Sequence, residues 1–118
     1  MEELIKAIEE QGWQVRITEQ DNLKIAELER FTPAKHDFVI EVQTFEKFTA
    51  EEFINALDEC CENYDVDYET YIWLGDDGHG KNGAPYHIKD ILADKEWELG
   101  KLKELSTRIK TKFNIKQK

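Results

Sequence analysis

The sequence predicts an α+β fold in a single domain that spans residues 1–118. Three observations lead to this expectation: apolar residues recur at a helical period near the start, at a period of two over the next three segments, and at a helical period again thereafter. We expect a short N-terminal helix, a three-stranded antiparallel meander, and then three to four helices packed on one face of the sheet. A chain of this length is large enough for one modest core.

A short first helix is expected before Gly12, because Leu4, Ile5 and Ile8 fall on one side of it and the glycine is placed to end it.

The next three segments each predict a strand. Apolar and polar residues alternate over 13–18, and a turn separates this segment from a second strand over 22–30. The pattern of the second strand shifts phase between Ile25 and Leu28, which predicts a bulge or a twisted edge. A third alternating segment covers 36–44.

A second helix is expected over residues 49–63, where the chain carries its clearest local signal. Thr49 and Glu52 form a capping box, and Phe48 and Phe53 are spaced for a hydrophobic staple. The apolar stripe of this helix is predicted to comprise Phe53, Leu57, Cys60, Cys61 and Tyr64.

Residues 67–74 fit either a strand or a helix. Their aromatic content suits a strand, whereas Asp65 or Asp67 as a cap favours a helix. After the glycine loop, Pro85 is placed to start a short amphipathic turn, and Asp94 is placed to cap a separate last helix. The stripe of that last helix is predicted to comprise Leu99, Leu102, Leu105 or Ser106, Ile109 and Phe113.

Charge is distributed unevenly along the chain. The formal net charge is −10, but residues 1–94 carry 23 acids and 8 bases, and residues 41–77 hold 12 acids against one lysine. Such a surface repels nucleic acid. We therefore expect a basic protein surface as the partner, with nucleic acid bound at most weakly through the basic C-terminal helix. The lysines and arginine of that helix also suit a solvated face that offsets the acidic body.

The location expected from the sequence is the cytoplasm. The first twelve residues are acidic and amphipathic and lack the features of a signal peptide, and no apolar run is long enough to span a bilayer. Cys60 and Cys61 are adjacent on a predicted helix and are expected to be reduced, because neighbouring helical cysteines do not meet disulfide geometry.

The glycine loop, GDDGHGKNGAPYH over residues 75–87, resembles the opening of a P-loop. Asn82 stands where a P-loop has Ser or Thr, and Asp76 and Asp77 would oppose phosphate, so a structured corner is the better interpretation. We expect positive-φ turns at its four glycines, with Trp73, Leu74, Tyr86 and Ile88 anchoring its ends in the core.

A metal site is the alternative use of the same acids. Asp65, Asp67 and Glu69 match three places of an EF-hand loop, but Thr70 replaces its glycine. A looser Mg²⁺ or Mn²⁺ site remains as a hypothesis, and it would make the chain a metal-dependent nuclease or a phosphate-handling enzyme. Its ligands would be Asp65, Asp67, Asp76, Asp77 and His79. No zinc spacing and no serine or cysteine nucleophile motif occurs, and no cofactor is predicted.

Residues 63–105 resemble part of a family of small uncharacterised acidic proteins encoded by phages and integrative mobile elements of gut bacteria. The shared order is Asp-x-Asp, an aromatic segment with Trp, a glycine loop reaching Pro, and acidic helices. The resemblance implies a bacterial mobile-element setting, and it brings no site residues with it.

These observations favour a non-enzymatic interaction module, for example an inhibitor or adaptor, over an enzyme. Its expected docking surface combines the acidic side of the second helix with the tip of the glycine loop, because binding residues concentrate on loops held by a scaffold. The predicted surface comprises Glu51, Glu52, Asp58, Glu59, Glu62, Asp76, Asp77, His79, Lys81 and Asn82.

Overall fold

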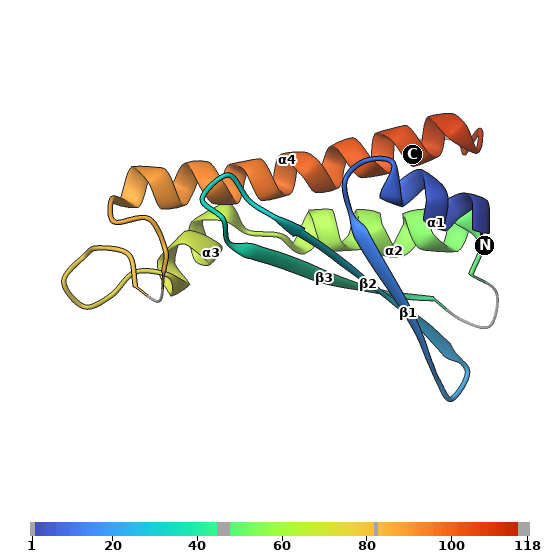
Figure 1. Cartoon of the computed structure of the whole chain (residues 1–118), viewed down its shortest axis with the longest axis horizontal. Coiled ribbons are helices and arrows are strands. Elements are labelled where there is room, and N and C mark those ends of the chain that lie inside the picture. Colours follow the sequence, from blue (N-terminus) through green and yellow to red (C-terminus); the bar gives the residue numbers. More distant parts are fainter. Residues whose placement is uncertain (1, 45–47, 82, 116–118) are drawn as a thin grey trace.

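The computed structural model describes residues 2–44, 48–81 and 83–115. The predicted fold class and element order are confirmed (Figure 1). The elements are α1 (Glu2–Glu9), β1 (Gln14–Gln20), β2 (Leu23–Phe31), β3 (Asp37–Thr44), α2 (Ala50–Asn63), α3 (Val66–Ile72) and α4 (Ile88–Lys112).

The three strands form an antiparallel sheet in the order β1-β2-β3. In the middle of the sheet, Leu28 pairs with Val15 on one side and with Ile40 on the other. The expected bulge or edge position of the second strand is wrong, because β2 is the central strand and pairs with both neighbours without a skipped residue. The apparent phase shift arises because Ile25 is half-buried on the outer face, whereas Ala26 and Leu28 are buried on the inner face.

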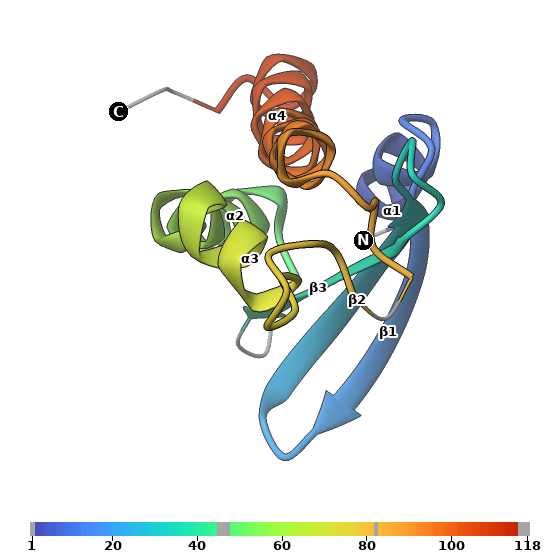
Figure 2. The ribbon, with the colours of Figure 1, turned by 90° about the vertical axis from the view of Figure 1, so that its left-hand side faces the viewer.

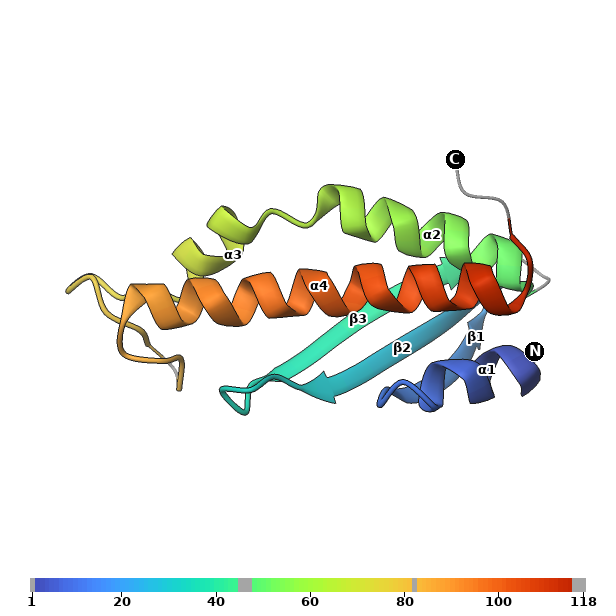
Figure 3. The same cartoon turned by 90° about the horizontal axis from the view of Figure 1, so that it is seen from above.

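The helices lie on one face of the sheet (Figure 2), and α4 runs the length of the molecule between α1 on one side and α2 with α3 on the other (Figure 3). The molecule is elongated, with principal extents of 47 × 30 × 23 Å. Within the described part of the chain, the other face of the sheet carries no helix, and the β1–β2 turn projects beyond the helical layer (Figures 1 and 2).

One apolar cluster joins the sheet, α1, α2 and the C-terminal half of α4. Phe53 and Leu57 of α2 and Leu105 and Ile109 of α4 are completely buried in it. At its rim, the guanidinium of Arg30 lies 5.2 Å from the ring centre of Trp13 and 5.0 Å from that of Trp97. Burial of this apolar surface supplies most of the driving force for folding.

The start of α2 is partly as predicted: the Thr49 cap and the hydrophobic staple form, but among the described residues no hydrogen bond joins the backbone N–H of Thr49 to the Glu52 carboxylate, so only half of the capping box is present. The hydroxyl of Thr49 accepts a hydrogen bond from the backbone N–H of Glu52 at 3.1 Å. The rings of Phe48 and Phe53 pack 5.8 Å apart, as a hydrophobic staple requires.

The alternative over 67–74 resolves as a helix, α3. The carboxylate of Asp65 accepts a hydrogen bond from the backbone N–H of Tyr68 at 3.1 Å and so caps its first turn.

The predicted break between two C-terminal helices is wrong. α4 is one continuous helix of 25 residues that begins at Ile88, three residues after Pro85. Asp94, expected as a cap, is a buried residue in the second turn of α4. The break was predicted because aspartate is a favoured helix cap. In the structure Asp94, Lys95 and Glu98 instead form a polar stretch on the buried side of the continuous helix.

Candidate functional site

The acidic side of α2 is partly as expected. Glu51, Glu59 and Glu62 are exposed. Glu59 and Glu62 line a groove of about 750 Å³ between α2 and α4. The other lining residues are Asn55, Asp58, Cys61, Asn63 and Lys110.

Asp58 does not belong to the open part of this side. Its carboxylate accepts a hydrogen bond from the hydroxyl of Ser106 at 2.5 Å and pairs with the ammonium of Lys110 at 2.8 Å. Asp58 therefore joins α2 to α4. Glu52 is also half-buried, and one of its carboxylate oxygens is buried without a hydrogen-bond partner among the described residues. Of the five acids predicted to form a docking surface on α2, three are therefore exposed.

The glycine loop is a structured corner, as predicted. An isolated antiparallel bridge pairs Leu74 with Gly80, and the backbone N–H of Lys81 donates to the carbonyl of Trp73 at 3.0 Å. Gly80 is required by close approach, because a Cβ built on it would lie 1.9 Å from the carbonyl oxygen of Pro85.

Two details predicted for this loop are wrong. Of its four glycines only Gly78 and Gly83 have positive φ. The backbone N–H groups of Gly75 and Gly80 instead donate hydrogen bonds across the loop, to the carbonyls of His79 and Tyr86. Tyr86 and Ile88 are exposed and do not anchor the loop in the core. Instead the ring of Tyr86 stacks on the imidazole of His79, with centres 4.0 Å apart and planes 14° apart.

The predicted recognition residues of the loop are partly accounted for. Asp76, Asp77 and Lys81 are exposed, and Asn82 lies outside the described residues. The carboxylate of Asp77 accepts a hydrogen bond from the backbone N–H of His79 at 3.0 Å and lies 3.7 Å from its imidazole. Asp77 and His79 therefore shape the tip of the loop and are also available at its surface.

The residues of the metal hypothesis are not brought together. Among the described residues, no group of three or more His, Cys, Asp or Glu side chains is placed to hold a metal ion. Asp65 caps α3, and Asp77 is engaged within its own turn with His79. The arrangement therefore gives no support to the five-ligand site of Asp65, Asp67, Asp76, Asp77 and His79.

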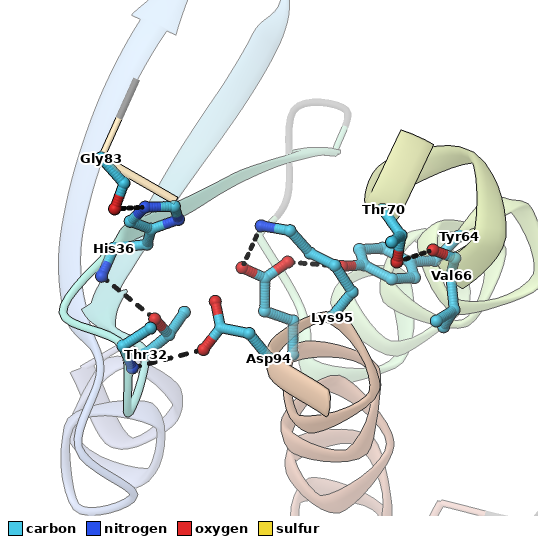
Figure 4. A network of polar contacts seen from close by, with 10 residues as sticks. Thr32, His36, Tyr64, Val66, Thr70, Gly83, Asp94 and Lys95 are labelled. Atoms are coloured by element: carbon cyan, nitrogen blue, oxygen red, sulfur yellow. Dashed lines mark hydrogen bonds and ion pairs between the residues drawn. The ribbon is translucent and has the colours of Figure 1, made fainter. Parts of the chain in front are cut away.

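A buried polar cluster that the sequence analysis missed lies between α3, the β2–β3 turn and the N-terminal half of α4 (Figure 4). The ammonium of Lys95 donates to the carboxylate of Glu98 at 3.2 Å, and both side chains are only 4% exposed. The phenol of Tyr64 donates to the other oxygen of the same carboxylate. Lys95 also lies 5.1 Å from the ring centre of Trp73.

The environment of this cluster shifts its titration. Burial raises the pKa of the Glu98 carboxyl above its usual range, although the phenol of Tyr64 and the ammonium of Lys95 oppose the shift. Burial and the hydrogen bond to Glu98 raise the pKa of the Tyr64 phenol, which therefore stays protonated as a donor.

The buried polar cluster also contacts the turn between β2 and β3, through Asp94. One carboxylate oxygen of Asp94 accepts from the backbone N–H of Ala34 at 3.4 Å, and Figure 4 shows this carboxylate pointing towards Thr32 and His36. The imidazole Nε2 of His36 lies 2.8 Å from the carbonyl oxygen of Gly83. Its ring also packs 4.9 Å from that of Trp73. These contacts tie the glycine loop to the sheet.

Cys60 and Cys61 are both half-buried, and neither forms a disulfide within the described residues. Burial, followed by the nearby carboxylate of Asp58, raises the pKa of Cys61 to about 11. Burial also raises the pKa of Cys60. Both thiols are therefore poor nucleophiles near neutral pH.

The basic C-terminal half of α4 is largely engaged with carboxylates. Lys101 and Arg108 pair with Glu104 at 3.1 and 2.8 Å. Lys112 lies 3.8 Å from the carboxylate of Glu10 on α1. This pattern agrees with the interpretation of the basic run as a face that offsets the acidic body.

No helix among the described residues is long and apolar enough to cross a membrane. In comparisons with known proteins, no family model matches this chain, and neither a curated protein nor a solved structure matches it.

Proposed function

We propose that this chain is a non-enzymatic, acidic interaction module that acts in the cytoplasm and docks a basic protein surface, such as one that ordinarily holds nucleic acid. A role as inhibitor or adaptor from a mobile element is part of this proposal. The observation that supports it most directly is the imbalance of ion pairs between the two long helices.

The bases of α4 are largely neutralised within the molecule, as the pairs of Lys101, Arg108 and Lys110 show. The exposed acids along α2 and the start of α3 are not. Among the described residues, no ion pair involves Glu51, Glu59, Glu62, Asp65 or Asp67. A row of unpaired carboxylates on two consecutive helices produces a negative field that a cationic surface would neutralise.

Opposite charges across such an interface act mainly on the encounter rate and on the choice of partner. Exposed pairs are screened by salt, so binding should weaken as ionic strength rises. The groove between α2 and α4 contributes concave shape to the same surface, and Glu59 and Glu62 lie at that groove.

The test compares two double variants with equal change of charge. Glu59→Lys with Glu62→Lys alters the acidic side of α2, whereas Glu9→Lys with Glu96→Lys alters two exposed acids elsewhere. Each variant is used to capture proteins from a bacterial lysate at about 50 and about 300 mM salt, and the association rate of a captured basic protein is then measured by biolayer interferometry.

We expect the α2 variant to lower the association rate about tenfold or more at low salt and the control variant to lower it much less. Equal rates for the two variants, or binding that does not change with salt, would contradict the proposal.

A further inference from the structure

Exposed apolar side chains gather at one end of the molecule. Two of the large apolar side chains that are exposed in the described part, Phe31 and Val39, lie on the sheet. The other five lie where α3, the glycine loop and the start of α4 meet, on the left in Figure 1. We call this set the aromatic end, and it comprises Tyr68, Tyr71, Ile72, Tyr86 and Ile88.

Three of these side chains form one stripe on α3. Tyr68, Tyr71 and Ile72 are spaced by three and four residues, so they share one side of the helix. Tyr68 is 61% exposed and Tyr71 is 71% exposed. A tyrosine ring in water offers a large contact area at a small cost in conformational entropy, which is why tyrosine is enriched at interfaces and among their strongest residues.

The stripe is held from beneath by the buried polar cluster. Thr70, on the inner side of α3, is buried and donates its hydroxyl to the carbonyl of Val66 at 2.8 Å. Trp73 at the end of α3 packs between the imidazole of His36 and the ammonium of Lys95. The hydrogen bond of Thr70 lies within α3, whereas the burial of Thr70 and the contacts of Trp73 with His36 and Lys95 hold the inner side of α3 against the molecule. The outer side of α3 is therefore preorganised for binding.

The loop side of the aromatic end is also ordered. Tyr86 is 60% exposed and is held by its stack on His79. The carbonyl of Tyr86 accepts a hydrogen bond from the backbone N–H of Gly80 at 3.1 Å. Both the ring and its backbone are therefore positioned before a partner arrives.

Charge around the aromatic end selects the partner. Residues 65–90 contain six acids and two lysines. Asp65, Asp67, Asp76, Asp77 and Asp90 are all exposed. A partner must therefore offer cationic groups that also pack on aromatic rings. Arginine does both, because its planar guanidinium stacks on tyrosine and binds carboxylates through two parallel hydrogen bonds.

We propose that the aromatic end is the centre of the docking surface and binds an arginine-rich segment of the partner protein. This inference rests on the proposed function and sharpens it: acids of α2 steer the encounter, while the tyrosines and acids of the aromatic end hold the arginines. Nucleic-acid bases also stack on tyrosine, but the surrounding carboxylates repel their phosphates. A second copy of the chain is disfavoured as the occupant, because it would bring the same negative charge and would be repelled.

The experiment is an isothermal titration of the full chain with three probes: a twelve-residue peptide of alternating Arg and Gly, the same peptide with Lys in place of Arg, and a twelve-nucleotide oligothymidine. The variants are Tyr68→Ala, Tyr71→Ala and, as matched control, Phe31→Ala, which removes an aromatic ring of similar exposure, 64%, from the sheet. Circular dichroism confirms that each variant is folded, and sedimentation at several concentrations reports self-association.

We expect the Arg peptide to bind at least about fivefold more tightly than the Lys peptide, since each stacked guanidinium is worth about two- to fivefold in affinity. Tyr68→Ala and Tyr71→Ala should each remove much of this preference, and Phe31→Ala should leave it unchanged. Equal affinity for the two peptides, tighter binding of the oligothymidine, or self-association that Tyr71→Ala abolishes would overturn the inference.

The Glu59→Lys and Glu62→Lys double variant separates this inference from the proposed function. If both peptides bind equally and both are weakened by that variant, the proposed function stands and the aromatic end is not its centre. If neither peptide binds and no basic protein is captured, both proposals fall.

Discussion

The two halves of α4 present the same side to the rest of the molecule but bury very different residues on it. The C-terminal half buries Leu102, Leu105 and Ile109 in the apolar cluster. The N-terminal half buries Asp94, Lys95 and Glu98 beside one apolar residue, Ile91, and the apolar cluster does not extend to them. One helix is thus held mainly by apolar packing at one end and mainly by buried polar contacts, including an ion pair, at the other.

We infer that the apolar half of α4 mainly stabilises the fold, whereas the polar half mainly fixes the arrangement of the elements around it. Apolar burial stabilises in proportion to area and tolerates many shapes. A buried ion pair gains little net free energy after desolvation, but it penalises every arrangement that leaves one charge alone. In this molecule the polar half is the one that carries α3 and the glycine loop, where the proposed docking surface lies. The four predictions that follow, in order of decreasing expected effect, test this contrast.

Loss of one charge in the polar half should have the largest effect. Lys95→Met leaves the buried carboxylate of Glu98 without its cation, and we expect the free energy of unfolding to fall by about 3–5 kcal/mol. The double variant Lys95→Met with Glu98→Gln removes both charges and should recover much of this loss. Urea unfolding measures all three proteins, and a double variant as unstable as the single one would show that the pair does not act as a unit.

Loss of apolar packing in the other half should cost somewhat less. Leu105 is completely buried, and Leu105→Ala should lower the free energy of unfolding by about 2–5 kcal/mol through lost burial and a residual cavity. Phe31→Ala, on the exposed side of the sheet, should change it by no more than about 0.5 kcal/mol. Similar losses for the two variants would mean that the apolar cluster is not where the structure places it.

A methyl group at Gly80 should disturb only the polar half. Gly80→Ala places a Cβ 1.9 Å from the carbonyl oxygen of Pro85 and should destabilise the chain by about 1–3 kcal/mol. Gly100→Ala is the matched control, because a Cβ there meets no atom within 4 Å and alanine favours a helix by about 0.8–1 kcal/mol. Thermal unfolding should therefore move in opposite directions for the two variants.

The smallest expected effect is a pH dependence due to Glu98. Its pKa is raised by burial, so the native chain holds this proton at a pH where the unfolded chain has released it. The stabilising contribution is complete below about pH 4 and is lost as pH rises through the raised pKa, with a slope of at most about 1.4 kcal/mol per pH unit. Glu98→Gln should flatten this part of the stability curve in urea titrations from acid to neutral pH. Parallel curves for the variant and the natural chain would contradict the assignment.

The same contrast explains what could be predicted from the sequence. The fold class, the three-stranded antiparallel sheet and the capped start of α2 could be predicted, because they follow from hydrophobic periodicity and from local signals that act within a few residues. α4 was divided in two because Asp94 was expected to be a helix cap, and its place on the buried side beside Lys95 and Glu98 is not visible when apolar residues alone define that side. The buried positions from Ile91 to Ile109 recur at helical spacing, whether they are polar or apolar. This spacing alone indicates one continuous helix.

The proposed docking surface includes residues that the sequence analysis placed elsewhere, for a related reason. Tyr86 and Ile88 were expected in the core because large apolar residues are more often buried than exposed. Their exposure depends on how the loop bridge and the buried charges orient this end of the molecule. Asp58 was expected on the open side of α2, and its use by Ser106 and Lys110 depends on the approach of α4. Such long-range pairings leave no local signal.

The positions of the three tryptophans give each half of the molecule its own fluorophore. Trp73 contacts His36 and Lys95 in the polar half, whereas Trp13 and Trp97 both contact Arg30 at the rim of the apolar cluster. The emission lost in a Trp73→Phe variant therefore isolates the signal of the region beside the aromatic end. Unlabelled protein can thus show whether the two halves melt together or in sequence.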